Sequence, residues 1–198
     1  MEAYLDNSAT TRVDAQVQEL MKKLMDVDFG NPSSRHQKGV VAEGYIKEAR
    51  QKIAATLKVD PKEFIITSGG TESNNMALIG TALAAKRKGN HIITTAVEHP
   101  SVKATASFLE EQGFRITFLS VDSRGQISLE DLKEALTPDT ILVSIMYVNN
   151  EIGSIQPIEA LVKLVKAHNP QILVHVDAVQ AYGKLKFTPK QLGVDLLS

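Results

Sequence analysis

The sequence predicts an α/β protein with a mostly parallel sheet and helices on both faces. Short apolar runs alternate with longer segments of helical periodicity along the chain. Runs such as 141-ILVSIM-146 are apolar at nearly every position, as strands covered by helices on both sides require. The chain has 198 residues, which is enough to bury a substantial core. This alternation of strands and helices is typical of a sheet layered between helices.

In the first half of the chain, two helical patterns precede the first apolar run. A run of four apolar-leaning residues then predicts a strand, and Met76, Leu78, Ile79 and Leu83 recur behind it at helical spacing. The elements expected in this half are, in order, helices at Asp14–Met25 and Gly39–Leu57, a strand at Phe64–Thr67, a helix at Thr71–Lys88 and a strand at His91–Thr95.

The second half of the chain continues the same alternation. Pro100 suits the first position of a helix, and Val194, Leu196 and Leu197 indicate a strand that is entered near the last residue. The segment 182-YGKLKFTPKQ-191 is expected to be a solvated edge and loop. The other expected elements are helices at Pro100–Gln112, Leu129–Leu136 and Ile158–His168, and strands at Arg115–Leu119, Ile141–Tyr147 and Leu173–Val176.

Composition excludes several classes of function. There are 22 Lys and Arg against 23 Asp and Glu, with no long run of either sign, which argues against a nucleic-acid partner. The sequence has no cysteine and its five histidines lack ligand spacing, so no disulfide and no metal site is predicted. It has no apolar signal core and no run long enough to span a membrane, so we expect a cytoplasmic protein with no membrane partner.

In a sheet of this kind, ligands bind beyond the carboxyl ends of the strands. The stretch 68-SGGT-71 follows the first expected strand, and two interpretations of it are open. It is either a tight turn with Thr71 as a helix cap, or an anion site in which Gly69 and Gly70 let a phosphate approach the helix N-terminus. Neither G-x-x-x-x-G-K-[ST] nor G-x-G-x-x-G occurs, so nucleoside triphosphates and dinucleotides lack their usual motifs.

Further polar residues follow other strands. Asp177 ends an apolar strand and is either a helix cap or the partner of a protonated pyridine nitrogen, with Gln180 in reach of the same ring's phenolic oxygen. His99 is either structural or a ring-stacking imidazole that moves protons. Asn149 and Asn150 are either turn formers or amides that bind a ring substituent or substrate.

A phosphate site, a stacking imidazole, an amide and a ring-pairing carboxylate together describe pyridoxal 5′-phosphate. The sequence resembles the cysteine desulfurases of the class V aminotransferase family, whose large domain has the fold-type I architecture of pyridoxal-phosphate enzymes. The resemblance runs in matching order and spacing through 4-YLDNSATTRVD-14, 30-GNPSSRH-36, 66-ITSGGTESNN-75, 92-IITTAVEHPSV-102, 143-VSIMYVNNEIG-153 and 174-VHVDAVQAYGK-184.

The resemblance implies a role for each candidate residue. Gly70 and Thr71 would hold the cofactor phosphate, and His99 would stack on the ring and serve as the catalytic proton carrier. Asn150 would touch the cofactor near the substrate, Asp177 would pair with the ring nitrogen, and Gln180 would bond the phenolic oxygen. The segments around Asn7, Ser8 and Ala9 and at 30–36 would line the substrate side.

The family's reaction converts L-cysteine to L-alanine and passes the sulfur to an acceptor or scaffold protein, for iron–sulfur cluster or thio-tRNA assembly. Residues 1–198 would form an incomplete large domain, because the family continues into a Ser-x-His-Lys stretch whose lysine forms the Schiff base. The later nucleophilic cysteine, the substrate-binding arginine and the small C-terminal domain would also be absent. We therefore expect this chain alone to be inactive, and Lys184 and Lys186 are not expected to replace the missing lysine.

The sequence leaves several functions open. The chain is either the cofactor-binding part of a cysteine desulfurase, or a non-catalytic, lysine-less paralogue or partner subunit in sulfur transfer. It also fits a fragment of a selenocysteine lyase or of another class V aminotransferase. The family's members are homodimers, so we expect self-association or a complementing C-terminal chain.

Overall fold

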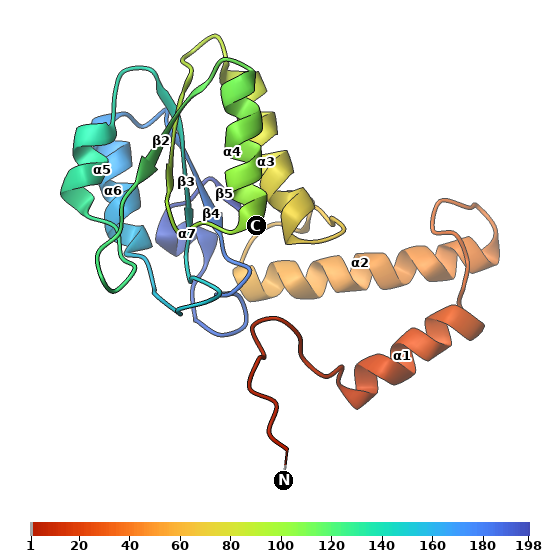
Figure 1. Cartoon of the computed structure of the whole chain (residues 1–198). Coiled ribbons are helices and arrows are strands. Elements are labelled where there is room, and N and C mark those ends of the chain that lie inside the picture. The colour runs from red at the N-terminus through yellow and green to blue at the C-terminus, as the bar shows by residue number, and fades with distance from the viewer. Residues whose placement is uncertain (1) are drawn as a thin grey trace. The chain divides into compact units, whose positions relative to one another are not determined.

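The computed structural model describes residues 2–198, which divide into two compact units that meet in sequence between Ile65 and Ile66 (Figure 1). The first unit contains α1 (Ala15–Asp26), α2 (Gln37–Leu57) and the short 3-10 helix η1 (Pro61–Glu63). Helix α1 starts where the Asp14 carboxylate accepts a hydrogen bond from the Gln16 main-chain N–H. Within residues 2–198, no helix is both long enough and apolar enough to cross a membrane.

The second unit is built on a five-stranded parallel sheet, which confirms the predicted fold class. The strand order is β2-β1-β3-β4-β5. Every residue of β3, the middle strand, is buried, whereas β2 lies at an edge and is partly exposed. The strands are β1 (His91–Thr95), β2 (Arg115–Leu119), β3 (Thr140–Met146), β4 (Leu173–Asp177) and β5 (Leu196–Leu197).

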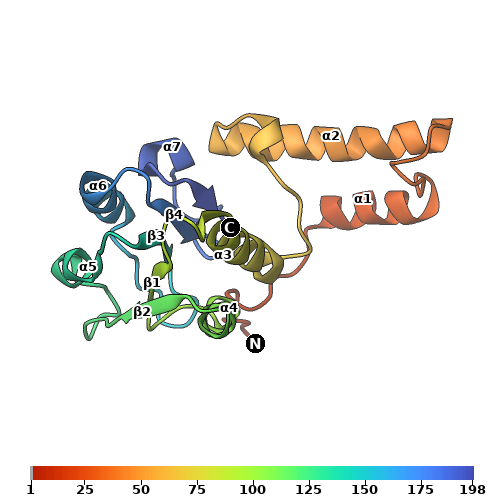
Figure 2. The ribbon, with the colours of Figure 1, turned by 90° about the horizontal axis from the view of Figure 1, so that it is seen from above.

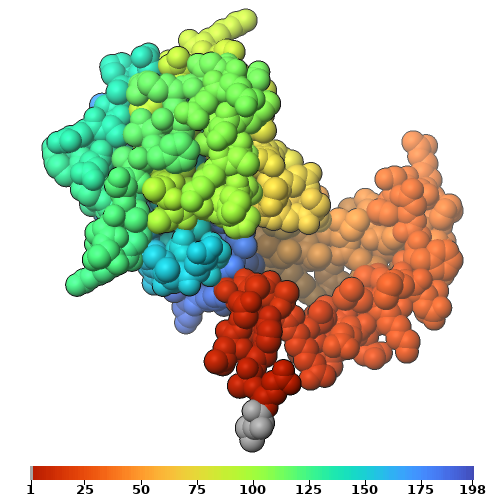
Figure 3. Space-filling model, in the orientation of Figure 1, coloured from red at the N-terminus to blue at the C-terminus, as the bar shows by residue number. Residues whose placement is uncertain are grey.

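Helices cover both faces of this sheet, as Figure 2 shows in the view from above. Successive residues of a strand point to opposite faces, so Leu142 joins the core beneath α3 and α4, while Val143 joins the core beneath α5 and α6. Residues of α4, β2 and α5 form the front of this unit in the space-filling view (Figure 3). The helices are α3 (Gly70–Ala85), α4 (Pro100–Glu111), α5 (Leu129–Ala135), α6 (Ile158–His168) and α7 (Pro189–Leu192).

Two expectations about these elements were wrong. Residues 64–67 form no strand, because no strand among residues 2–198 pairs with them; Ile65 and Ile66 are 63% and 53% exposed. The segment expected to be a plain loop contains α7, which has a Thr188 cap and Pro189 in its first turn. Gly193 ends α7 in the left-handed conformation, with φ 73°.

Two histidines are buried in the sheet and bonded on both ring nitrogens. His175 lies 2.9 Å from the Ser144 hydroxyl through Nδ1 and 2.9 Å from the Ser198 hydroxyl through Nε2. His91 makes equivalent contacts of 2.8 Å with Thr140 and Thr117. Burial lowers the pKa of each histidine from 6.5 to about 4, so both imidazoles are neutral in the fold near pH 7.

The neutral state of His175 makes folding sensitive to acid. The unfolded chain takes up a proton as the pH falls below about 6.5, while the folded chain does not until about 4, so stability is lost across that window. Between pH 7 and pH 5 we expect His175 to contribute a loss of roughly 2 kcal/mol in the free energy of unfolding. Urea denaturation at pH 7 and pH 5 measures this loss of unfolding free energy. The loss should be smaller in His175→Gln than in the unsubstituted chain, and unchanged in the control His168→Gln, because His168 is exposed. Equal losses in all three proteins would contradict this origin.

Candidate functional site

The carboxylate of Asp177 lies at the end of β4, only 5% exposed. Its Oδ2 accepts a hydrogen bond of 2.8 Å from the Asn74 side-chain amide, and its Oδ1 accepts one of 3.0 Å from the Val179 main-chain N–H. Asn74 belongs to α3, so the end of β4 is tied directly to the beginning of that helix. A buried carboxylate held by two neutral donors is suited to accept a further, cationic partner.

Helix α3 begins at Gly70, with Gly69 as its N-cap and no side-chain cap among residues 2–198. The alternative interpretation of Thr71 as the cap is therefore wrong, because Thr71 is already the second residue of the helix. The first main-chain N–H groups of a helix have no partner inside it and carry a partial positive charge. A Cβ at Gly70 would lie 2.9 Å from the Val179 side chain, so this helix start is next to the loop that follows Asp177.

His99 is the exposed N-cap of α4, directly beyond the end of β1. Its Nδ1 accepts a hydrogen bond of 3.2 Å from the Ser101 main-chain N–H and lies 2.8 Å from the Ser101 hydroxyl. An Nδ1 that accepts places the proton of the neutral ring on Nε2. The Ser101 hydroxyl in turn accepts from Asn74 at 3.0 Å, so an unbroken series of contacts joins His99 to Asp177.

The two asparagines after β3 differ in their surroundings. Asn149 is buried, its Nδ2 donates to the Val97 carbonyl at 2.9 Å, and its Oδ1 accepts from the N–H groups of Glu151 and Ile152, each at 2.9 Å. Asn150 is half-buried in the same turn. Asn149 therefore fixes the loop, and Asn150 is the amide that remains for a ligand.

This difference predicts unequal effects of two alanine substitutions. Asn149→Ala should lower the free energy of unfolding by roughly 2 kcal/mol, because three hydrogen bonds to main-chain groups are lost. Asn150→Ala should change it by less than about 0.5 kcal/mol. Urea denaturation of both variants measures this, and a larger loss in Asn150→Ala would reverse the assignment.

Gln180 lies half-buried in the turn that follows β4, three residues beyond Asp177. The ammonium group of Lys184 donates to its Oε1 at 2.5 Å. The six predicted site residues thus follow β1, β3 and β4 or begin α3, all in the second unit. Ser101 and Asn74 join His99 to Asp177, and the start of α3 at Gly70 lies next to Val179. Asn150 lies in the turn after β3 and Gln180 in the turn after β4.

Sequence reasoning missed two residues that connect this site. Asn74 and Ser101 bridge α3, α4 and β4, yet neither was assigned a role. The only sequence signal was the pair of amides in 72-ESNN-75 behind the glycines. Their bridging role depends on a contact between positions 103 residues apart, which no local pattern contains.

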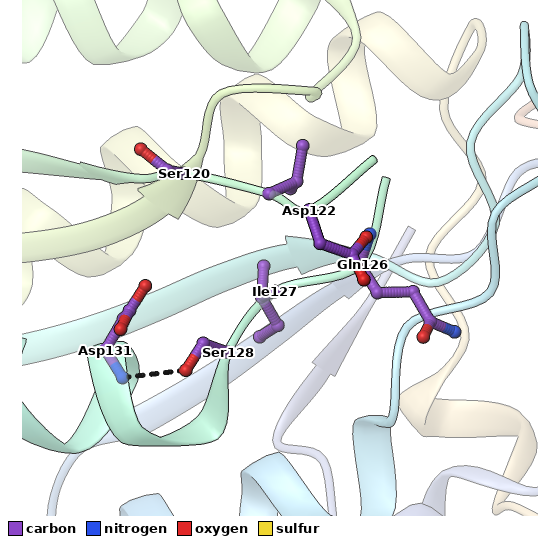
Figure 4. A pocket seen from close by; sticks show the side chains of 7 residues that line it. Ser120, Asp122, Gln126, Ile127, Ser128 and Asp131 are labelled. Atoms are coloured by element: carbon purple, nitrogen blue, oxygen red, sulfur yellow. Dashed lines mark hydrogen bonds between the residues drawn. The ribbon is translucent and has the colours of Figure 1, made fainter. Parts of the chain in front are cut away.

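A separate hollow of about 290 Å³ lies beside the hairpin that follows β2 (Figure 4). The start of α5 forms one wall, where the Ser128 hydroxyl accepts a hydrogen bond from the Asp131 N–H. Asp122 and Asp131 make the hollow unsuited to a phosphate group, since like charges repel. None of the predicted residues lines it; its lining is Ser120, Val121, Asp122, Gln126, Ile127, Ser128 and Asp131.

Comparison with known proteins matches residues 3–198 to the family described as aminotransferase class-V. The chain belongs to this family. It is 51% identical over 197 residues to a cysteine desulfurase IscS of Dictyoglomus turgidum, covering 100% of this chain and 50% of that protein. The chain thus spans about half the length of the curated relatives it matches.

Solved structures agree with this family. A NifS-like protein superposes with a TM-score of 0.96 at 44% identity, covering 100% of this chain and 55% of that one. The structure described as SspA in complex with cysteine superposes with a TM-score of 0.92 at 40% identity, covering 98% and 56%. The expected resemblance to NifS- and IscS-like cysteine desulfurases is therefore confirmed for these residues, as is their fold.

Proposed function

We propose that the carboxyl edge of this sheet binds pyridoxal 5′-phosphate, and that residues 1–198 are the cofactor-binding portion of a cysteine desulfurase. The observation that carries this proposal is the buried Asp177 carboxylate, joined through Asn74 and Ser101 to His99 and lying beside the start of α3. The site thus combines a buried anion and an exposed imidazole, linked by hydrogen-bond contacts, with a helix N-terminus next to them.

The residues fit the chemical groups of this cofactor. Main-chain N–H groups at Gly70 and Thr71, with the Thr71 hydroxyl, would hold the phosphate, because a helix N-terminus favours an anion. The absence of a side chain at Gly70 keeps the approach beside Val179 open. Asp177 would hold the protonated ring nitrogen, and Gln180 would donate to the phenolic oxygen.

The bound cofactor would supply an electron sink for the substrate's bonding electrons. Asp177 would favour the protonated ring, the form in which the cofactor withdraws electrons best. His99 would stack on the ring, and its Nε2 proton, placed there by the Ser101 N–H at Nδ1, is the one available for transfer. Asn150 would orient the cofactor on the substrate side.

The substrate and partners of the whole protein belong to the same proposal. We propose L-cysteine as substrate, L-alanine as product, and a sulfur-acceptor or scaffold protein in iron–sulfur cluster or thio-tRNA assembly as recipient. The names of the matched relatives support this, and one solved relative is described with cysteine bound. Assembly as a homodimer or with a complementing chain, and a cytoplasmic location, remain predictions.

Residues 1–198 would bind the cofactor without completing the reaction. They include no cysteine to receive sulfur, and the lysine implied by the resemblance is not among them. Purified chain mixed with pyridoxal phosphate should therefore retain cofactor in equilibrium dialysis, yet give no stoichiometric adduct by mass spectrometry after borohydride reduction. It should release no sulfide from cysteine.

Two outcomes would count against the proposal. If the chain retained no pyridoxal phosphate in equilibrium dialysis, the proposed binding site would be wrong. A stoichiometric adduct on Lys184 or Lys186, together with sulfide release, would show that the chemistry uses a different lysine from the one the family implies.

A further inference from the structure

Glu98, the residue before His99, carries a carboxyl group that is almost completely enclosed. Its side chain is 3% exposed and lies beyond the end of β1. Oε1 accepts hydrogen bonds from the Thr95 hydroxyl at 2.7 Å and from the Met146 main-chain N–H at 2.9 Å. Oε2 is buried and has no partner among residues 2–198.

These contacts extend the junction of β1 and β3 beyond the last residue of β1. Strand β1 ends at Thr95, whereas β3 continues to Met146. The Met146 main-chain N–H donates to Glu98 Oε1, and the Asn149 side-chain amide donates to the Val97 carbonyl. The short segment that leads into His99 is therefore fastened to the end of β3 at two points.

Burial of the Glu98 carboxyl group favours its protonated form. Burial raises the pKa of its carboxyl to about 8, and the Asp177 carboxylate on β4 acts in the same direction. The hydrogen bonds from Met146 and Thr95, and the Lys103 ammonium on α4, act in the opposite direction. The Glu98 carboxyl group is bonded to Met146, and Met146 lies opposite Asp177 in the pairing of β3 with β4. The carboxyl groups of Glu98 and Asp177 are therefore close enough to interact electrostatically.

We propose that Glu98 is a positioning residue: its carboxyl group, bonded to Thr95 and Met146, fixes His99 at the site without adding a second buried carboxylate charge near Asp177. The significance of Asp177 rests on the proposed function. The geometry of the Glu98 contacts does not depend on it, so the inference is testable without cofactor.

Two substitutions distinguish the role of the Glu98 carboxyl oxygen as a hydrogen-bond acceptor from the role of its charge state. Glu98→Gln keeps a neutral group with an acceptor oxygen at Oε1, and it replaces an unpartnered O–H donor by an unpartnered N–H donor. Glu98→Leu keeps similar bulk but removes the acceptor, which leaves the Met146 N–H unpaired. Glu111→Gln, at an exposed position near the end of α4, is the matched control.

The test is NMR of the ¹³C- and ¹⁵N-labelled chain without cofactor. We expect the His99 imidazole resonances to be unchanged in Glu98→Gln and Glu111→Gln, and shifted or broadened in Glu98→Leu. In the unsubstituted chain, the Glu98 side-chain carbon should titrate near pH 8, and the Asp177 carboxyl carbon should shift over the same range. That Asp177 shift should be absent from Glu98→Gln.

The inference is overturned if the Glu98 carboxyl titrates near its ordinary value of 4.5, or if Glu98→Gln moves the His99 resonances as far as Glu98→Leu does. If Glu98→Leu fails to fold, the titration of Glu98 and the behaviour of Glu98→Gln decide the question. Loss of pyridoxal-phosphate binding in an otherwise unchanged chain would count against the proposed function alone, because these resonances are measured without it.

Discussion

Replacing Asp177 by asparagine should weaken the binding of pyridoxal phosphate to this chain roughly ten- to a hundredfold. The variant loses a charged hydrogen bond to the ring nitrogen, and such bonds contribute about 1.5–3 kcal/mol. The fold should survive, because asparagine retains an oxygen for the Val179 N–H. The other side-chain position of the new asparagine is an NH₂ group, which faces Asn74. If the Asn74 side-chain amide rotates by half a turn, its buried Oδ1, which has no partner among residues 2–198, can accept a hydrogen bond from that group.

Equilibrium dialysis measures the affinity, and circular dichroism checks the fold. Asp139→Asn is the matched control, because Asp139 is exposed and precedes β3, at the amino rather than the carboxyl edge of the sheet. We expect the control to bind like the unsubstituted chain. Equal affinities for Asp177→Asn and the unsubstituted chain would remove Asp177 from the site.

Replacing Leu142 by alanine should lower the free energy of unfolding by about 2–5 kcal/mol. Leu142 lies in the middle strand, is 0% exposed and belongs to the core beneath α3 and α4. The same substitution at Leu83, which is 55% exposed on α3, should change stability by less than about 0.5 kcal/mol. Urea denaturation of the two variants measures the difference, and similar losses at both positions would contradict the assigned core.

Since most domains are stable by only about 5–15 kcal/mol, the Leu142 variant should also bind cofactor poorly at elevated temperature. Strand β3 lies between β1 and β4, and His99 and Asp177 lie at the carboxyl ends of these two strands. A destabilised core beneath β3 would therefore disturb the positions of both His99 and Asp177.

The strands that pair within these residues could be predicted closely from sequence. The bounds of β1 and β2 match the expected His91–Thr95 and Arg115–Leu119. For β1 the reason is that a buried parallel strand is a continuous run with few charged residues. The same signal failed at Phe64–Thr67, where apolar composition is present but a paired strand is not. Apolar composition indicates only that a segment is suited to burial, whereas a strand also requires an adjacent strand with which its main chain can form hydrogen bonds.

The site was predictable in part for a related reason. The rule that ligands bind beyond the carboxyl ends of parallel strands led to His99, Asn150 and Asp177, since each lies at or beyond the end of a strand. It did not point to Asn74 or Ser101, and it located Glu98 without a role, because the roles of these three residues come from contacts across elements. The structure also separates Asn149, which fixes the loop, from Asn150, a distinction that two adjacent amides do not make in sequence.

The most direct test of the proposed site is a titration of the ¹⁵N-labelled chain with pyridoxine 5′-phosphate, followed by amide NMR. This analogue has the ring and the phosphate but no aldehyde, so it cannot react with surface lysines. We predict saturable shifts at Gly70 and Thr71, at His99, and in the loop from Asp177 to Gln180. Shifts confined to the hollow around Asp122 and Asp131, or no saturable shifts at all, would contradict a cofactor site at the carboxyl edge of this sheet.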